Sequence, residues 1–327
     1  MRSAEWLYEE GIGENRAILV EDDEILVAAI ELPGEMRCGA VLAGRLVDIP
    51  IAGRRGIVAT AQGEVMVEPL PGGVTQGRRV RVEIVREPIA EPGKPKYARG
   101  RITDAEEREG PSLAQSIGAA ARPAPPGPDR FEEAGWSELI DEAISGEIDF
   151  PGGALRMSLT PAMTLFDVDG FLPPAELAVA GAEAAALAIR RLGIGGSIGI
   201  DLPTIPSRAD RLRAVAALDS ALPRPFERTA VNGFGFLQVV RRRERRSLPE
   251  LLQWDPVGGA ARDLLRRAEW EAGLGPREIV AAPAVVARLR ANPAWIETLA
   301  QRVGGAVALR EEPAFTTWGG HVHARLS

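Results

Sequence analysis

The pattern that most restricts the fold of this chain lies at residues 164–201, where a strand, a helix and a second strand follow one another. The apolar run TLFDVDG at 164–170 has the composition of a buried strand and ends on acidic side chains. A proline pair then begins an Ala-rich helix, which we expect to stop at Gly193. The next apolar run, GSIGIDLP, ends on another acid, Asp201. Such a unit is almost always a right-handed crossover between parallel strands, so we expect an α/β fold.

Two acidic residues, Asp167 and Asp201, are expected to meet at one edge of this sheet. If the two strands are neighbours, their backbones lie roughly 4.8 Å apart. Ligands of open α/β sheets bind at the carboxyl ends of the strands. Like charges at this separation repel each other unless a cation or a proton lies between them. Mg²⁺ suits two such carboxylates because it keeps several waters and binds substrate phosphates. In the alternative interpretation, the two aspartates only cap the turns that follow their strands.

The run TLFDVDG also resembles the nucleophile motif of haloacid-dehalogenase-type phosphatases. In that family the first aspartate, here Asp167, attacks the phosphoryl group, and the second, here Asp169, acts as acid and base. Those enzymes also need a later cationic side chain, normally lysine. The lysines of this chain, Lys94 and Lys96, precede the motif, which lies midway along the chain rather than at its start. We therefore rank a phosphatase below a metal-dependent enzyme.

Three patterns organise the chain before this unit. Residues 16–31 contain two short apolar runs around an acidic turn and predict a β-hairpin. Residues 36–103 contain about five short Val- and Ile-rich runs between glycine turns, which predicts a small β-barrel. Residues 104–130 hold five prolines and few large apolar side chains, so we expect a linker or mobile loop there.

Helical spacing and glycine stops predict further elements in the second half of the chain. Apolar residues from Trp136 onward recur at helical spacing until Gly146. The segment ALRMSLTPAMTLFDVDG, at 154–170, has the pattern of two strands broken at Pro161. Three more elements are expected, namely a helix at about 208–222, a hairpin at 228–243 and a helix at 257–272, followed by a compact α/β region.

An arginine-rich stretch covers residues 208–246, where ten arginines stand against four acidic residues. Its densest part is RRRERR at 241–246. A block of this kind is commonly a solvated helix face or strand edge. Beside an edge that cleaves phosphodiesters, Arg241 and Arg243 would instead hold backbone phosphates.

Several motifs together resemble the ribonuclease E/G family. They are AMTLFDVDG, EAAALAIRRLGIGGSIGID, NGFGFLQVVRRR, the N-terminal hairpin and the C-terminal REIVAAPAVVARLRAN and GGHVHARL. The resemblance implies an α/β protein of α+β multidomain organisation. The implied parts are a ribonuclease H-like part (1–35 with 131–157), an oligonucleotide-binding-type β-barrel (36–103), a Pro-rich linker (104–130), a catalytic α/β core with parallel strands (158–250) and a C-terminal small domain (257–327).

The resemblance also implies an activity, because the family cuts single-stranded RNA endonucleolytically with Mg²⁺ and leaves a 5′-phosphate. By position, Asp167 and Asp201 would hold the metal ion. Asp169 stands where the family has an asparagine that is thought to orient the attacking water or the scissile phosphate. Phe234, with Arg241 and Arg243, belongs to a matching stretch and would contact RNA.

Departures from the family carry expectations of their own. The segment that senses a 5′-monophosphate is reduced to the linker, so we expect no 5′-end sensing. WDPVGG at 254–259 occupies the place of the zinc-binding cysteine pair, so we expect neither zinc nor a zinc-linked tetramer, which leaves a homodimer open. The expected barrel has no aromatic residue between Tyr8 and Tyr97 on which bases can stack, so RNA contact there would rest on arginines (Arg45, Arg54, Arg55, Arg78, Arg79 and Arg81). Because Asp169 and Gly233 differ from the family, an RNA-binding protein that has lost the chemistry is the main alternative.

Composition limits where such a protein works. The N-terminal residues carry acid instead of the positive flank and long apolar stretch of a secretory signal, and Cys38 is the only cysteine. The most apolar long window is interrupted by Glu176 and Glu183, so we expect no membrane span. We therefore expect a cytoplasmic protein.

Overall fold

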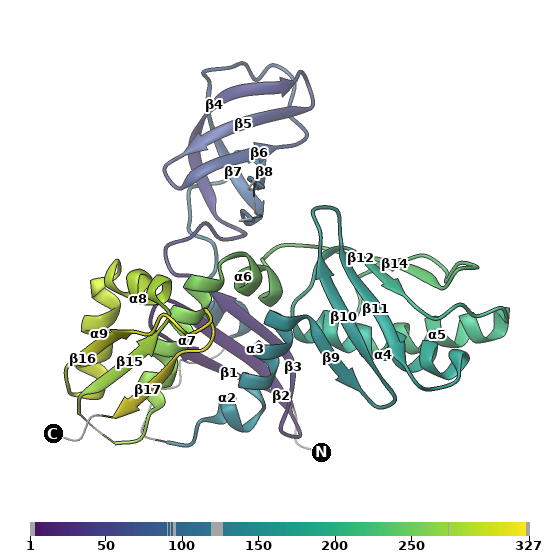
Figure 1. Ribbon diagram of the computed structural model, residues 1–327. Helices are drawn as coiled ribbons and strands as arrows, with labels where there is room; N and C mark the ends of the chain where they lie inside the picture. The colour runs from purple at the N-terminus through teal and green to yellow at the C-terminus, as the bar shows by residue number, and fades with distance from the viewer. Residues whose placement is uncertain are drawn as a thin grey trace.

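The computed structural model describes residues 4–89, 91, 93, 96–118, 127–273 and 275–324. Figure 1 shows a β-barrel that stands above two α/β lobes lying side by side. One of these, the terminal lobe, is built from both ends of the chain (β1–β3, α1–α3, α6–α9 and β15–β17), and the other, the sheet lobe, consists of β9–β14 with α4 and α5. The expected mixed α/β architecture with a barrel is confirmed. Among the described helices, none combines the length and the apolar character needed to cross a bilayer.

The terminal lobe contains two small sheets. The first is antiparallel, in the order β1 (Glu5–Glu10), β2 (Asn15–Glu21) and β3 (Glu24–Glu31). The predicted hairpin at 16–31 is confirmed, because β2 and β3 pair across a two-residue turn. The second sheet has the order β16 (Val307–Glu311), β15 (Arg277–Ala281) and β17 (His321–Ala324). The helices are α1 (Leu113–Ile117), α2 (Arg130–Glu133), α3 (Trp136–Ser145), α6 (Leu248–Trp254), α7 (Pro256–Trp270), α8 (Pro283–Arg290) and α9 (Pro293–Val303).

The barrel closes around an apolar interior. Its strands are β4 (Val41–Ile51), β5 (Arg55–Thr60), β6 (Gly63–Val67), β7 (Arg79–Arg86) and β8 (Ala98–Thr103), in the closed order β4-β5-β6-β8-β7. Leu46, Val58 and Val82 are fully buried inside it. The predicted small barrel at 36–103 is confirmed.

Part of the predicted linker at 104–130 is structured instead. Residues 113–117 form α1, which begins with a capping box between Ser112 and Gln115. Leu113 is buried against the first sheet, and its main-chain N–H donates to Glu31 Oε2 at 2.7 Å. The prediction of a loose segment is therefore wrong for α1, and residues 119–126 lie outside the described part of the chain.

The sheet lobe carries the strand–helix–strand unit. Its six strands are β9 (Glu147–Phe150), β10 (Gly153–Leu159), β11 (Thr164–Gly170), β12 (Gly196–Asp201), β13 (Glu227–Arg228) and β14 (Phe236–Arg241), in the order β13-β14-β12-β11-β10-β9. β11 and β12 are parallel neighbours joined by α4 (Pro174–Arg191), as expected. The sheet begins at residue 147, whereas the expected catalytic core began at 158, because the β9–β10 hairpin pairs with β11.

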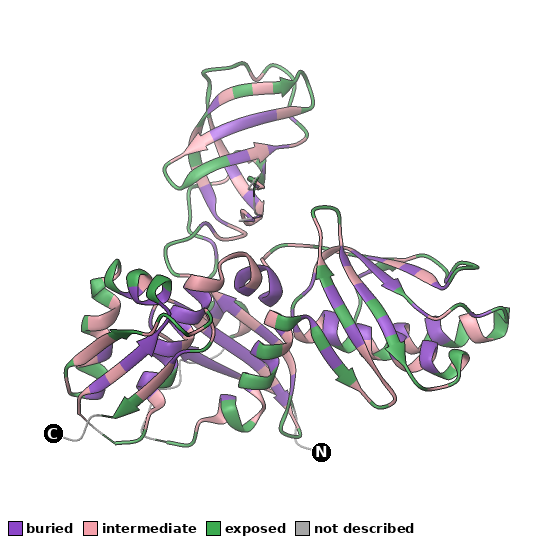
Figure 2. Ribbon diagram, viewed as in Figure 1, coloured by how far each residue is buried: buried purple, intermediate pink, exposed green. Residues whose placement is uncertain are grey.

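One face of this sheet is covered by α4, and the other is exposed. The covering helix is rich in alanine because it packs closely, with Ala178, Ala182 and Ala185 fully buried. At Gly181 a side-chain Cβ would lie only 2.4 Å from Val168 of β11, so this position requires glycine for helix–sheet packing. α5 (Arg208–Ala221) packs against α4. In Figure 2 buried and exposed residues alternate along β10 and β11, as expected for a sheet with one solvated face.

Buried ion pairs join α7 to the first sheet. Arg16 of β2 is 1% exposed and contacts Glu9 at 2.7 Å and Glu14 at 2.8 Å. From α7, Arg262 contacts Glu14 at 2.7 Å. Arg266 contacts Glu9 at 3.1 Å. Charges that are shielded from water thus hold the two ends of the chain together.

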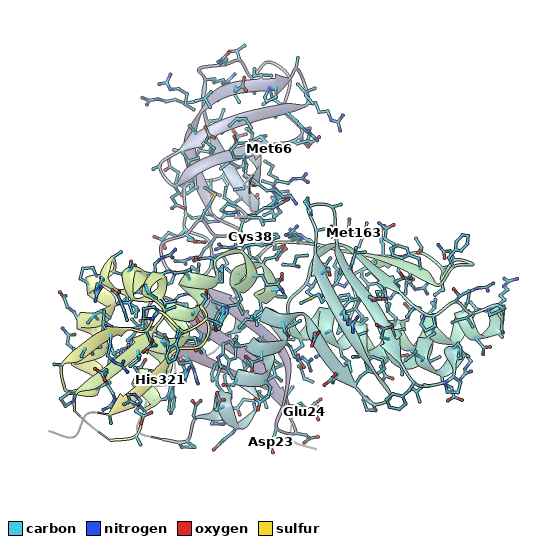
Figure 3. The ribbon with its side chains drawn as sticks, viewed as in Figure 1. Asp23, Glu24, Cys38, Met66, Met163 and His321 are labelled. Atoms are coloured by element: carbon cyan, nitrogen blue, oxygen red, sulfur yellow. The ribbon has the colours of Figure 1, made fainter. Side chains whose placement is uncertain are left out.

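The base of the barrel meets the segment between β14 and α6. The main-chain N–H of Glu87 donates to the carbonyl oxygen of Glu244 at 2.9 Å. The carboxylate of Glu87 lies 4.0 Å from Arg245. Arg246 also forms an ion pair with Glu35. Cys38 is labelled near this junction in Figure 3, and its backbone forms a hydrogen bond with Glu87 that favours the charged carboxylate.

Substitution of Glu87 by glutamine is expected to stabilise the protein in mild alkali. Burial raises the pKa of Glu87 to about 7, although the charge of Arg245 opposes this shift. The unfolded chain has a pKa of about 4.3 for such a group, so folding favours the protonated form and the free energy of unfolding falls as the pH rises through 7. The glutamine variant should lose about 2 kcal/mol less than the wild type between pH 5 and pH 8 in urea titrations. An unchanged pH dependence would contradict this account.

Candidate functional site

The structure places Asp167 and Asp201 directly opposite each other on neighbouring strands. β11 and β12 are parallel, and their register pairs these two residues. Because neighbouring strands lie about 4.8 Å apart, the two carboxylates lie within reach of one small cation. Both side chains are exposed, since they alternate with core residues such as Phe166 and Ile200. The predicted meeting of the two aspartates at one place on the sheet is confirmed.

Asp169 lies on the same exposed face and pairs with an arginine that our sequence interpretation did not include. Nη1 of Arg156, on β10, lies 3.6 Å from Oδ2 of Asp169, and the two side chains are 66% and 62% exposed. Such an exposed pair contributes little to stability, so a ligand can displace it readily. Arg156 is also the cross-strand neighbour of Asp167. The alternation of apolar and polar residues along β10 indicates on which face of the sheet Arg156 lies. Only the register of the β10–β11 hairpin shows which residues Arg156 contacts.

The carboxylates of this face fit Mg²⁺. Within the described residues, no group of three or more His, Cys, Asp or Glu side chains is arranged to hold a metal ion. Mg²⁺ does not require such a group, because one or two carboxylates commonly hold it while waters and substrate phosphates complete its shell. Asp167 and Asp201 are such a pair on an exposed surface, and they are the residues that would hold the ion.

The prediction that Arg241 and Arg243 lie beside the carboxylates is wrong. β14 runs antiparallel to β12, so Arg241 pairs with Gly196 at one end while Phe236 pairs with Asp201 at the other. The five residue steps from Phe236 to Arg241 span about 16 Å along the strand. Helical and strand periodicity do not reveal the direction in which a strand is paired, which is why the sequence pattern misplaced both arginines.

Both arginines have structural partners at that far end. Arg241 donates to the carbonyl oxygens of Ile189 at 3.3 Å and Ile194 at 3.1 Å, where α4 ends and the chain turns toward β12. Arg243 forms an ion pair with Glu250 of α6. Burial lowers the pKa of both guanidinium groups. The two side chains therefore hold α4 and α6 against the sheet.

Phe234 does lie at the end of the sheet that carries Asp201, in the loop that precedes β14. Its side chain is 84% exposed. Asn232 organises the loop, because its Oδ1 accepts the main-chain N–H of Phe234 at 2.9 Å and that of Phe236 at 3.0 Å. The N–H of Leu202 donates to the carbonyl oxygen of Gly235 at 3.2 Å. Gly235 has a φ of 96°, and a Cβ there would lie 2.2 Å from the Leu202 oxygen, so the loop requires glycine at this position.

Comparison with known proteins assigns neither a family nor a function to this chain. No protein-family model matches the chain, and no curated protein matches it significantly. The chemistry of the exposed face therefore has to be argued from the residues themselves.

Proposed function

We propose that this protein is a Mg²⁺-dependent endoribonuclease of the ribonuclease E/G type, which cuts single-stranded RNA and leaves a 5′-phosphate. The observation that carries the proposal is the in-register pair of Asp167 and Asp201 on an exposed sheet face. Two adjacent carboxylates repel each other, and a shared divalent cation relieves that repulsion. The same pair suits phosphodiester chemistry, because Mg²⁺ accepts substrate phosphate oxygens beside one or two carboxylates.

Each residue of the face has a distinct role in this proposal. Asp167 and Asp201 hold the ion, which when bound stabilises charge on the phosphodiester and supplies an activated water. Asp169 orients the attacking water or the scissile phosphate, as the asparagine of the related motif is thought to do. Arg156 balances the charge of Asp169 and offers its exposed guanidinium to a phosphate oxygen.

The barrel supports RNA as the substrate. Its closed five-stranded order, with parallel pairing of β6 and β8, supports the proposal of an oligonucleotide-binding fold. Residues 36–103 contain twelve basic and six acidic side chains, a net charge of +6, in a chain whose total is −7. A basic module in an acidic protein suits electrostatic contact with a phosphate backbone. The ribonuclease H-like character of residues 1–35 with 131–157 stays a prediction.

Two other functions make different predictions. An RNA-binding protein without chemistry is favoured by one observation, the negative charge of Asp169 where the related motif has a neutral asparagine. A haloacid-dehalogenase-type phosphatase needs a cation beside its nucleophile. Lys96, however, contacts Glu91 at 2.6 Å and the carbonyl oxygen of Pro161 at 2.9 Å, in the β10–β11 turn that precedes β11, whereas Asp167 lies at the middle of that strand. That placement argues against the phosphatase.

The experiment that tests the proposal is cleavage of a short, 5′-labelled single-stranded RNA by the full-length protein. We expect internal cuts with Mg²⁺, new 5′-phosphate ends, and no cuts with EDTA. RNA that is bound but never cut with Mg²⁺ or Mn²⁺ would favour the RNA-binding protein. Turnover of a small phosphomonoester through an acyl-phosphate on Asp167 would favour the phosphatase.

A further inference from the structure

Two phenylalanine side chains are more exposed than any other large apolar side chain in the described part of the chain. Phe171 is 86% exposed and Phe234 is 84% exposed, whereas the next, Leu212, is 57% exposed. Burial of an aromatic side chain typically removes about 150 Å² or more from water, so leaving two of them exposed gives up a substantial stabilisation. Single exposed apolar side chains are common on protein surfaces, so these two rings are informative because of where they lie relative to the carboxylate pair.

Both rings belong to segments at the end of the sheet that carries Asp201. Phe171 directly follows β11, four residues after Asp167. Phe234 lies two residues before Phe236, which begins β14 and pairs with Asp201. β12 lies between β11 and β14 in the sheet, so the two segments flank the strand that ends at Asp201. The strands that lead to the two rings are about 10 Å apart.

The main chain holds both rings in place. The N–H of Phe171 donates to the carbonyl oxygen of Gly152 in the β9–β10 turn at 3.2 Å. The carbonyl oxygen of Phe234 accepts the hydroxyl of Thr204 at 3.4 Å, in addition to the hydrogen bonds from the loop to Asn232. The rings are therefore presented by anchored segments, which reduces the entropy lost when a ligand binds.

The chemistry between the rings favours a nucleic acid strand over a protein partner. Charged side chains, not apolar ones, separate them on the sheet, namely Asp167 on β11 and Asp201 on β12. A stable protein interface buries about 800 Å² on each side around a continuous apolar centre. Isolated aromatic rings beside cationic side chains are instead typical of single-stranded nucleic acid sites, where bases stack on the rings. The exposed Arg156, the cross-strand neighbour of Asp167, provides such a cation.

We propose that Phe171 and Phe234 are base-stacking platforms for single-stranded RNA whose backbone crosses the carboxylate pair between them. This inference rests on the proposed function and adds a reason for its substrate class. Bases in a duplex are already paired and stacked on their neighbours, so neither ring can contact their faces. A single strand offers one base to each ring, and the scissile linkage lies between the two.

The test measures binding and cleavage separately with the full-length protein. A short single-stranded RNA that contains 2-aminopurine reports binding by anisotropy and stacking by fluorescence quenching, with Ca²⁺ in place of Mg²⁺. Phe171→Ala and Phe234→Ala should each raise Kd by about 5- to 100-fold and reduce the quenching. Tryptophan at either position should restore both. In cleavage assays with Mg²⁺ the alanine variants should raise KM more than they lower kcat. Leu187→Ala, at an exposed apolar position of α4, is the matched control and should change neither value.

The possible outcomes separate this inference from the function on which it rests. If the wild type cleaves RNA and the alanine variants bind and quench as it does, the stacking role is overturned and the nuclease stands. If the wild type neither binds nor cleaves single-stranded RNA, the proposed function fails and the inference fails with it. If the variants lose self-association in sedimentation experiments but keep full RNA affinity, the rings cover a dimer interface, which also overturns the inference.

Discussion

Replacement of Asp167 or Asp201 by asparagine is expected to abolish RNA cleavage and to leave RNA binding and folding intact. Asparagine preserves the size of the side chain but removes the negative charge that holds a divalent cation. A bound ion contributes several kcal/mol to the stability of the transition state, so the rate constant should fall by at least about 100-fold. Both side chains are exposed, so the free energy of unfolding should change by no more than about 0.5 kcal/mol.

A neighbouring carboxylate provides the matched control for this experiment. Asp149 is exposed on β9, on the same face of the sheet, and pairs with Ala154 instead of with a residue of the site. Asp149→Asn should therefore cleave RNA at the wild-type rate. Cleavage that persists in both Asp167→Asn and Asp201→Asn would show that the active site lies elsewhere.

Replacement of Arg16 by leucine is expected to destabilise the fold more than any other single change considered for this chain. Its guanidinium group is shielded from water between Glu9 and Glu14, and leucine would leave both carboxylates short of a partner. Removing one member of a buried ion pair typically costs about 3–5 kcal/mol, because the remaining charge stays buried. Urea titration of the full-length protein measures this loss. Arg213→Leu is the control, since Arg213 forms an exposed pair with Asp210 and should cost less than about 1 kcal/mol.

The same network should make the wild type lose stability in acid. Burial alone would raise the pKa of Glu14, but the charges of Arg16 and Arg262 outweigh burial and hold this pKa below its ordinary value. The unfolded chain therefore binds a proton more readily than the folded protein. The stabilisation from Glu14 is present above the unfolded pKa of about 4.3 and is lost as the pH falls through the folded value. Arg16→Leu should weaken this acid dependence, and an unchanged dependence would exclude the network as its source.

The elements of the fold that have a strong local pattern of apolar residues, glycines and prolines were predictable from the sequence. The crossover from β11 through α4 to β12 follows from two apolar runs, a proline pair and Gly193, and it brings Asp167 beside Asp201. The barrel follows from short Val- and Ile-rich runs between glycine turns. In each of these the interactions that decide the structure lie close together in the sequence or follow a general rule of handedness.

Features that depend on distant contacts were not predictable in this way. α1 is stabilised by burial of Leu113 against residues about a hundred positions earlier, such as Tyr8, and the surrounding prolines masked its capping box. The antiparallel direction of β14 moved Arg241 to the far end of the sheet. Phe171 gave no signal because exposure of an aromatic residue after a strand depends on what the rest of the chain leaves uncovered.

The measurement that tests the central claim most directly is a crystal structure of the protein soaked in Mn²⁺, with the ion located by its anomalous scattering. We predict a peak within about 2–2.5 Å of carboxylate oxygens of both Asp167 and Asp201, and no such peak in crystals of Asp167→Asn. Anomalous density at any other group of side chains, with none between these two strands, would contradict the assignment of the site.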